Sequence, residues 1–158
     1  MIIQAGFDLE LLARLLIVPE GTVLHKLVVI GLDSSMQLAS IQVVSHQFDG
    51  RMEPYFRAIL DQLDVESTRY FAVAHAGAWP ECPNQAAPVL EEAEALRTLA
   101  HQRGFQMIGH FGLDGTEYMS NGPHYYFDRY HLGLPCTMDH WVHSQYGSCG
   151  PQAGRGRD

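Results

Sequence analysis

The feature that most constrains the fold of this chain is an unbroken apolar run, Leu27-Val28-Val29-Ile30, within the segment from His25 to Leu32. A strand turns successive side chains to opposite faces of a sheet, so a continuous apolar run has no face suited to water. We therefore expect an interior strand that is covered on both sides. Helices packed on the sheet would supply that cover.

The rest of the chain alternates between helical and strand-like periodicity, with turn residues where the pattern changes. Three segments predict helices: from a cap at Asp8 to the stop at Pro19-Glu20-Gly21, from Glu53 to Leu63, and, after a loop over residues 77–87, from Pro88 to the stop at Gly104. Five segments predict strands: His25–Leu32, Leu38–Ser45, Tyr70–Ala74, Phe105–Phe111 and Thr116–Ser120. The order helix, strand, strand, helix, strand, helix, strand, strand predicts an α/β (α+β) fold with a central mixed sheet flanked by helices.

Composition narrows the class of protein. The 158 residues fit one domain, and 46% hydrophobic residues allow a sizeable core. The net charge of −8 disfavours a broad nucleic-acid surface, because phosphate backbones are repelled by a negative body. No apolar run approaches the ~20 residues of a membrane span, and an odd number of widely spaced cysteines is no disulfide framework. We therefore expect a cytoplasmic protein that does not contact a membrane.

The last part of the chain has a different character. From Asn121 onward glycine, proline, histidine and tyrosine dominate, and regular periodicity fades. We place a domain over residues 1–120 and interpret residues 121–158 as an irregular C-terminal extension with a flexible tail. Cys/His-rich tracts can bind zinc, so one hypothesis is a structural zinc in this extension, and the other is a segment that covers a sheet edge or docks a partner. The candidate ligands are His124, His131, Cys136, His140, His143 and Cys149.

A histidine at a strand end is the most prominent candidate for chemistry. Residues 69–80 run through an apolar strand to His75 and then into a segment with Gly77 and Pro80. Strand ends are places where a rigid scaffold holds a side chain while the following loop leaves it reachable. We therefore treat His75 as the centre of a candidate site.

Six short segments carry a resemblance to a known family. They are Leu24 to Ser45, Glu53-Pro54-Tyr55-Phe56-Arg57-Ala58-Ile59-Leu60, Phe71-Ala-Val-Ala-His75, Ala95-Leu96 to Gly104-Phe105, Met107-Ile108-Gly109-His110 and Tyr118-Met119-Ser120. In this order and at these distances, over roughly residues 8–120, they resemble the RadC-like branch of the JAB/MPN metalloprotease-type domains. The resemblance implies the three-layer, cytidine-deaminase-like architecture of that family.

The same resemblance implies a zinc site that this chain does not complete. In the family, two histidines and a downstream aspartate hold zinc, and an upstream acidic group helps to activate the bound water. His75 matches the first histidine, whereas the second falls on Gly77 and the aspartate falls near Pro88 or Val89. Gly109 stands where the family has an acidic residue before a later histidine. A catalytic zinc needs three protein ligands and an open position, so the resemblance implies a degenerate metal-binding motif.

Two functions from different classes remain open. The first is a non-catalytic JAB-type domain that acts as a binding or assembly module, because function depends on the site and not on the fold. Its partner would be another protein or a second copy of this chain, docked through Leu9–Leu16 or an uncovered sheet edge. The candidate binding residues are His75, Trp79 and His110, with Trp79 either a core residue or an exposed anchor for a partner.

The second function is a zinc-dependent hydrolase, peptidase-like or nuclease-like, with a rearranged ligand set. Cys82 follows His75 closely, and His110 is expected on the neighbouring strand, so His75, Cys82 and His110 form a candidate metal site. Glu91 or Glu92 could reach the same place if the intervening loop packs closely. The competing interpretation is that both histidines are hydrogen-bonded residues at strand ends.

Overall fold

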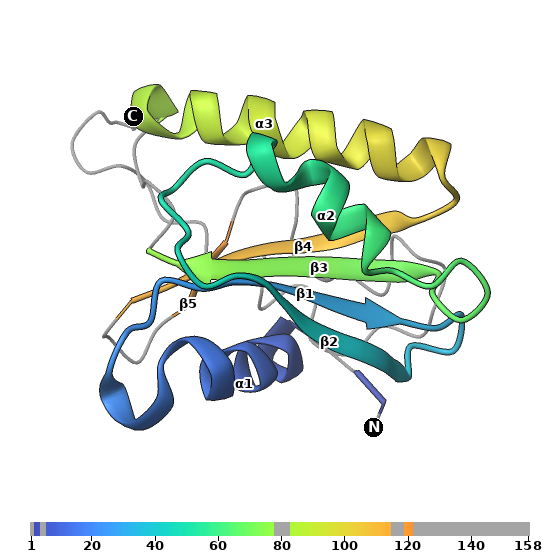
Figure 1. Ribbon diagram of the computed structural model, residues 1–158, viewed down its shortest axis with the longest axis horizontal. Coiled ribbons are helices and arrows are strands. Elements are labelled where there is room, and N and C mark those ends of the chain that lie inside the picture. Colours follow the sequence, from blue (N-terminus) through green and yellow to red (C-terminus); the bar gives the residue numbers. More distant parts are fainter. Residues whose placement is uncertain (1, 4–5, 78–82, 115–118, 122–158) are drawn as a thin grey trace, which may run out of the picture.

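The predicted order of elements is confirmed in the computed structural model, which describes residues 2–3, 6–77, 83–114 and 119–121 (Figure 1). The helices are α1 (Gly6–Ile17), α2 (Phe56–Asp61) and α3 (Pro83–Gln102), with the 3₁₀ turns η1 (Pro19–Gly21) and η2 (Glu53–Tyr55). The strands are β1 (Leu27–Leu32), β2 (Leu38–Ser45), β3 (Tyr70–Ala76), β4 (Gln106–Leu113) and β5 (Met119–Asn121). The C-terminal extension proposed from the sequence lies outside the described residues, apart from Asn121.

The strands form one mixed sheet in the order β2-β1-β3-β4-β5. β3 and β4 run parallel, and the other neighbouring pairs are antiparallel. The parallel pair needs a crossover connection, and α3 supplies it. β1 lies inside the sheet and all six of its residues are buried, as its apolar run predicts.

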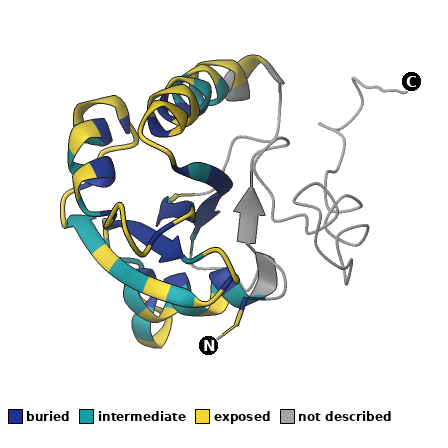
Figure 2. Ribbon diagram, turned by 90° about the vertical axis from the view of Figure 1, so that its right-hand side faces the viewer, coloured by how far each residue is buried: buried dark blue, intermediate teal, exposed yellow. Residues whose placement is uncertain are grey.

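Helices cover both faces of the sheet (Figures 1 and 2). On one face, α1 packs on a core that includes Val28, Ile30 and Phe111. On the other face, α2 and α3 pack on a core that includes Val29 and Val73. The predicted central mixed sheet with flanking helices is thus confirmed. Among the described residues, no helix is both long and apolar enough to span a membrane.

The start of the third helix was predicted wrongly. The sequence predicts a loop over residues 77–87 and a helix from Pro88, whereas α3 begins at Pro83 and carries Pro88 inside it. Proline is favoured in the first turn because its missing N–H has no partner there in any case. By that rule either proline could begin the helix, so local pattern alone could not choose between them. Smaller differences occur at α1, which begins two residues before Asp8, and at the ends of several strands.

Candidate functional site

The two histidines singled out from the sequence meet inside the domain. His75 lies near the end of β3, and its Nε2 atom is 2.8 Å from Nε2 of His110 on the parallel neighbour β4. Alternation along β3 sends His75 to the same face as Phe71 and Val73, which is the face covered by α2 and α3. Both imidazoles are buried, and their rings meet edge to face with centroids 4.9 Å apart.

A bulge in β4 places His110 on that face. Phe71 pairs with Met107, but the next residue of β3, Ala72, pairs with Gly109, so Ile108 is an extra residue in β4. One extra residue reverses the side to which all later side chains point. Met107 therefore contacts the core under α2 and α3, Ile108 contacts the core under α1, and His110 returns to the side of His75.

Gly109 is required by the packing around this bulge. A Cβ atom at residue 109 would lie 2.6 Å from Cζ of Phe111 and 3.2 Å from Cβ of Ala72. The Phe111 ring, which is fully buried in the core under α1, therefore occupies the space of a side chain at residue 109. An acidic residue at this position would displace that ring, so the glycine is explained by the core.

The hydrogen bonds around the pair define one arrangement of protons. The carbonyl oxygen of Ala76 lies 3.0 Å from Nδ1 of His75 and can only accept, so Nδ1 carries the hydrogen. In neutral His75, Nε2 is then the acceptor, and Nε2–H of His110 donates to it. Each Nε2 atom is thus engaged with the other imidazole.

Burial favours the neutral form of both imidazoles. Burial lowers the pKa of His110 well below its usual value, and the neighbouring His75 lowers it further. Burial also lowers the pKa of His75, an effect that the hydrogen bond to Ala76 and the charge of Glu92 partly oppose. The Phe48 ring packs against His75 with centroids 5.0 Å apart and adds to the apolar surroundings.

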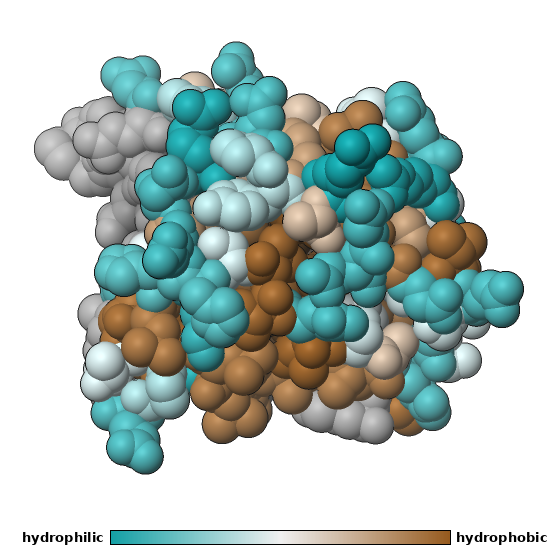
Figure 3. Space-filling view, in the orientation of Figure 1, coloured by the Kyte–Doolittle hydropathy of each residue, from teal (hydrophilic) through white to brown (hydrophobic). Residues whose placement is uncertain are grey.

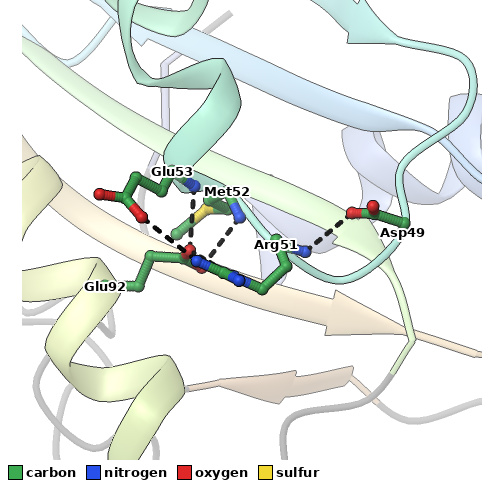
Figure 4. A network of polar contacts seen from close by, with 5 residues as sticks. All are labelled: Asp49, Arg51, Met52, Glu53 and Glu92. Carbon is green, nitrogen blue, oxygen red and sulfur yellow. Dashed lines mark hydrogen bonds and ion pairs between the residues drawn. The ribbon is translucent and has the colours of Figure 1, made fainter.

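A carboxylate from α3, that of Glu92, holds residues 51–53 (Figure 4). Glu92 accepts hydrogen bonds from the backbone N–H groups of Met52 at 2.8 Å and Glu53 at 2.9 Å, and Arg51 Nε lies 3.4 Å from the same carboxylate. These N–H groups belong to the start of η2, where a negative charge is favourable. Glu92 thereby fixes the chain that leads from Phe48 to α2.

Sequence reasoning missed Phe48 and the role of Glu92. Glu91 and Glu92 were weighed as groups that could reach His75, and Glu92 instead binds backbone amides while Glu91 is exposed. A signal was present in the helical phase, because Glu92 lies four residues before Leu96 and eight before Ala100, which are fully buried. A carboxylate on the inner face of a helix needs a partner.

The other predicted site residues do not join the pair. Trp79 and Cys82 lie outside the described residues. Gly77, the position of the family's second histidine, has φ +95°, a backbone conformation in which a side chain is strained, and its N–H donates to Leu113 O at 2.7 Å. A histidine at this position would therefore strain the backbone at the end of β3.

The described residues do not fit a catalytic zinc. In the described ranges there is no group of three His, Cys, Asp or Glu residues that could hold a metal ion. Tetrahedral zinc with bonds of about 2.0–2.1 Å keeps two ligand nitrogens about 3.3 Å apart. The two Nε2 atoms are closer, at 2.8 Å, and bond directly to each other. The described part of this site therefore resembles a hydrogen-bonded core pair more than a metal centre.

Comparisons with protein-family models and with curated proteins find no match to this chain.

Proposed function

We propose that this chain is a non-catalytic, RadC-like JAB domain that acts as a binding or assembly module, with residues 1–120 as the domain and residues 121–158 as an extension. The observation that carries the proposal is the direct hydrogen bond between His75 and His110 within the core. A hydrolytic zinc needs free nitrogens on its ligands and an open position for water. Here the two Nε2 atoms are engaged with each other, and Phe48 packs against His75.

The fold also supports the JAB assignment within this proposal. The element order, the mixed sheet and the helices on both of its faces agree with the three-layer, cytidine-deaminase-like architecture that the resemblance implies. Two positions that depart from the family pattern have structural explanations of their own. Gly77 occupies a backbone conformation that favours glycine, and Gly109 leaves room for Phe111.

The competing function is the zinc-dependent hydrolase with a rearranged ligand set of His75, Cys82 and His110. The observation in its favour is the convergence of two Nε2 atoms, one from His75 near the end of β3 and one from His110 within the parallel strand β4. A metal ion held by both would need the two nitrogens about 3.3 Å apart, against 2.8 Å here. The two functions therefore differ in a quantity that can be measured, the metal content of the protein.

The test is elemental analysis of the untagged, folded protein. We expect zinc well below one ion per chain in the wild type, with no change in His75→Ala. The matched control is His101→Ala, because His101 is an exposed histidine on α3. About one zinc per chain that is lost in His75→Ala and retained in His101→Ala would contradict the proposal and establish the metal site. Zinc retained in both variants would belong to other residues and would leave the interpretation of the pair intact.

A further inference from the structure

The outer edge of β2 is a long strand edge. β2 has eight residues and pairs with β1 on one side only, and no strand in the described part of the chain pairs with its other side. The opposite edge of the sheet is the three-residue strand β5. An edge strand presents a row of backbone N–H and C=O groups that can pair with another strand.

The sequence of β2 contains few of the features that prevent such pairing. Edge strands are commonly protected by charged residues, especially lysine, or by proline. No Asp, Glu, Lys, Arg or Pro occurs between Asp33 and Asp49, although 18% of the chain is charged. The register shifts in the β1–β2 ladder lie toward the ends of β2 and leave the centre regular, with Ile30 opposite Ile41 and Val29 opposite Gln42.

Apolar side chains continue from this edge onto α1. Ile41 and Val43 of β2 are only partly buried, and they pack on the same core as Leu12 and Leu16 of α1. Farther out on α1, Leu15 is 72% exposed. Figure 3 shows hydrophobic side chains gathered over the part of the surface that β2 and α1 form in Figure 1. A partner with a polar surface would not bury these apolar side chains. An uncharged strand with apolar residues beside it could pair with the β2 backbone and cover them.

We propose that β2 pairs antiparallel with β2 of a second copy of this chain, so that the two sheets join across a two-fold axis. This inference rests on the proposed assembly function and names its partner. In an isologous interface each residue must be compatible with the same surface of the other copy. β2 meets this condition because it contains no charge that would face a like charge.

The charge of the whole chain favours this place of contact over most others. Each copy carries a formal charge of −8, so two copies repel wherever their acidic surfaces approach within a Debye length, about 10 Å at 0.1 M salt. A charge-free strand and an apolar helix face minimise that repulsion. A two-fold axis at Gln42, which is exposed at the centre of β2, places Gln42 opposite Gln42 and Ile41 of one copy opposite Val43 of the other.

Light scattering and sedimentation of the full-length protein over a range of concentrations test the proposal. We expect a species of twice the 17.7 kDa chain mass, whose formation is favoured by added salt because salt screens the repulsion. Gln42→Lys and Gln42→Glu each place like charges across the axis, and each should weaken dimerisation roughly tenfold or more. An equimolar mixture of the two variants should recover the dimer, because opposite charges then meet.

The control is Gln102→Lys, which adds the same charge at an exposed position of α3 and should leave dimerisation unchanged. Circular dichroism shows that each variant is folded before its mass is interpreted. A chain that stays monomeric at all concentrations, or a dimer that neither Gln42 variant weakens, overturns the proposal. These outcomes do not depend on the zinc measurement, so a failure of strand pairing is distinguishable from a failure of the proposed function.

Discussion

Replacing Glu92 by alanine removes the carboxylate that links α3 to the start of η2. The side chain of Glu92 is 12% exposed, and its two backbone hydrogen bonds are 2.8 and 2.9 Å long. A hydrogen bond to a charged group contributes about 1.5–3 kcal/mol when buried. Water replaces the partner of the exposed Glu53 N–H, so we assign about 1 kcal/mol to that bond and about 1–2 kcal/mol to the bond of the partly buried Met52 N–H.

The expected loss of unfolding free energy is therefore about 2–3 kcal/mol, and the ion pair with the exposed Arg51 adds less than about 0.5 kcal/mol. For a chain of this size, at about 2–4 °C per kcal/mol, the loss corresponds to a fall in Tm of about 4–12 °C. Urea denaturation followed by circular dichroism measures the change. Glu92→Gln should lose about half as much, because its amide keeps one acceptor oxygen and turns a donor toward the second N–H.

Glu91→Ala is the matched control, since Glu91 is the exposed neighbour on the same helix and makes the same change in helix propensity. Hydrogen exchange provides a local measurement, because the amides of Met52 and Glu53 should lose protection in Glu92→Ala only. If Glu92→Ala is as stable as Glu91→Ala and both amides keep their protection, the carboxylate does not hold this segment.

Two further predictions concern the packing of β4 around Gly109 and the protonation of the histidine pair. Gly109→Ala should destabilise the fold by about 1–3 kcal/mol, because the added Cβ meets the Phe111 ring. The same substitution should cost less in a chain that already carries Phe111→Leu. A double-mutant cycle of unfolding free energies that shows no such coupling would refute the contact. Stability should be constant above about pH 7.5 and should fall as the pH drops below about 6.5, because the lowered pKa values of His75 and His110 mean that the unfolded chain takes up protons first. The slope is about 1.4 kcal/mol per pH unit for each proton taken up only by the unfolded chain. Urea midpoints measured between about pH 8 and 5.5 give the dependence of stability on pH. Compared with the wild type, this slope should be smaller in His110→Gln and unchanged in His101→Gln. Equal slopes in all three proteins would contradict the buried neutral pair.

The local sequence pattern predicted a helix or strand well where a single kind of signal was dominant in the segment. The apolar run in β1 requires cover on both faces wherever it occurs, and it is buried between helices as expected. The order of the elements follows from periodicity and turn residues alone. The start of α3 was missed because the sequence offers two prolines that could begin a helix, and the structure shows that Pro83 does so while Pro88 lies inside the helix.

The candidate site was predicted in part. His75 was recognised as a strand-end residue, and His110 was placed on the neighbouring strand, so their proximity was within reach of sequence reasoning. The hydrogen bond itself was not, because the side to which His110 points depends on the bulge at Ile108. A bulge is an extra residue in one strand relative to its paired neighbour. Its position depends on how the two strands pair, so the sequence of one strand does not predict it.

The amino-acid sequence by itself determined which segments form helices and strands, because periodicity, turns and caps act between residues close in the chain. Only the tertiary structure decided that His110 faces His75, that Phe111 excludes a side chain at Gly109, and that Glu92 binds the amides of a segment about 40 residues away in the chain. Each of these depends on the register and packing of elements distant in sequence. Such contacts are set by the shape and hydrogen-bonding capacity of the assembled core, which no local pattern contains.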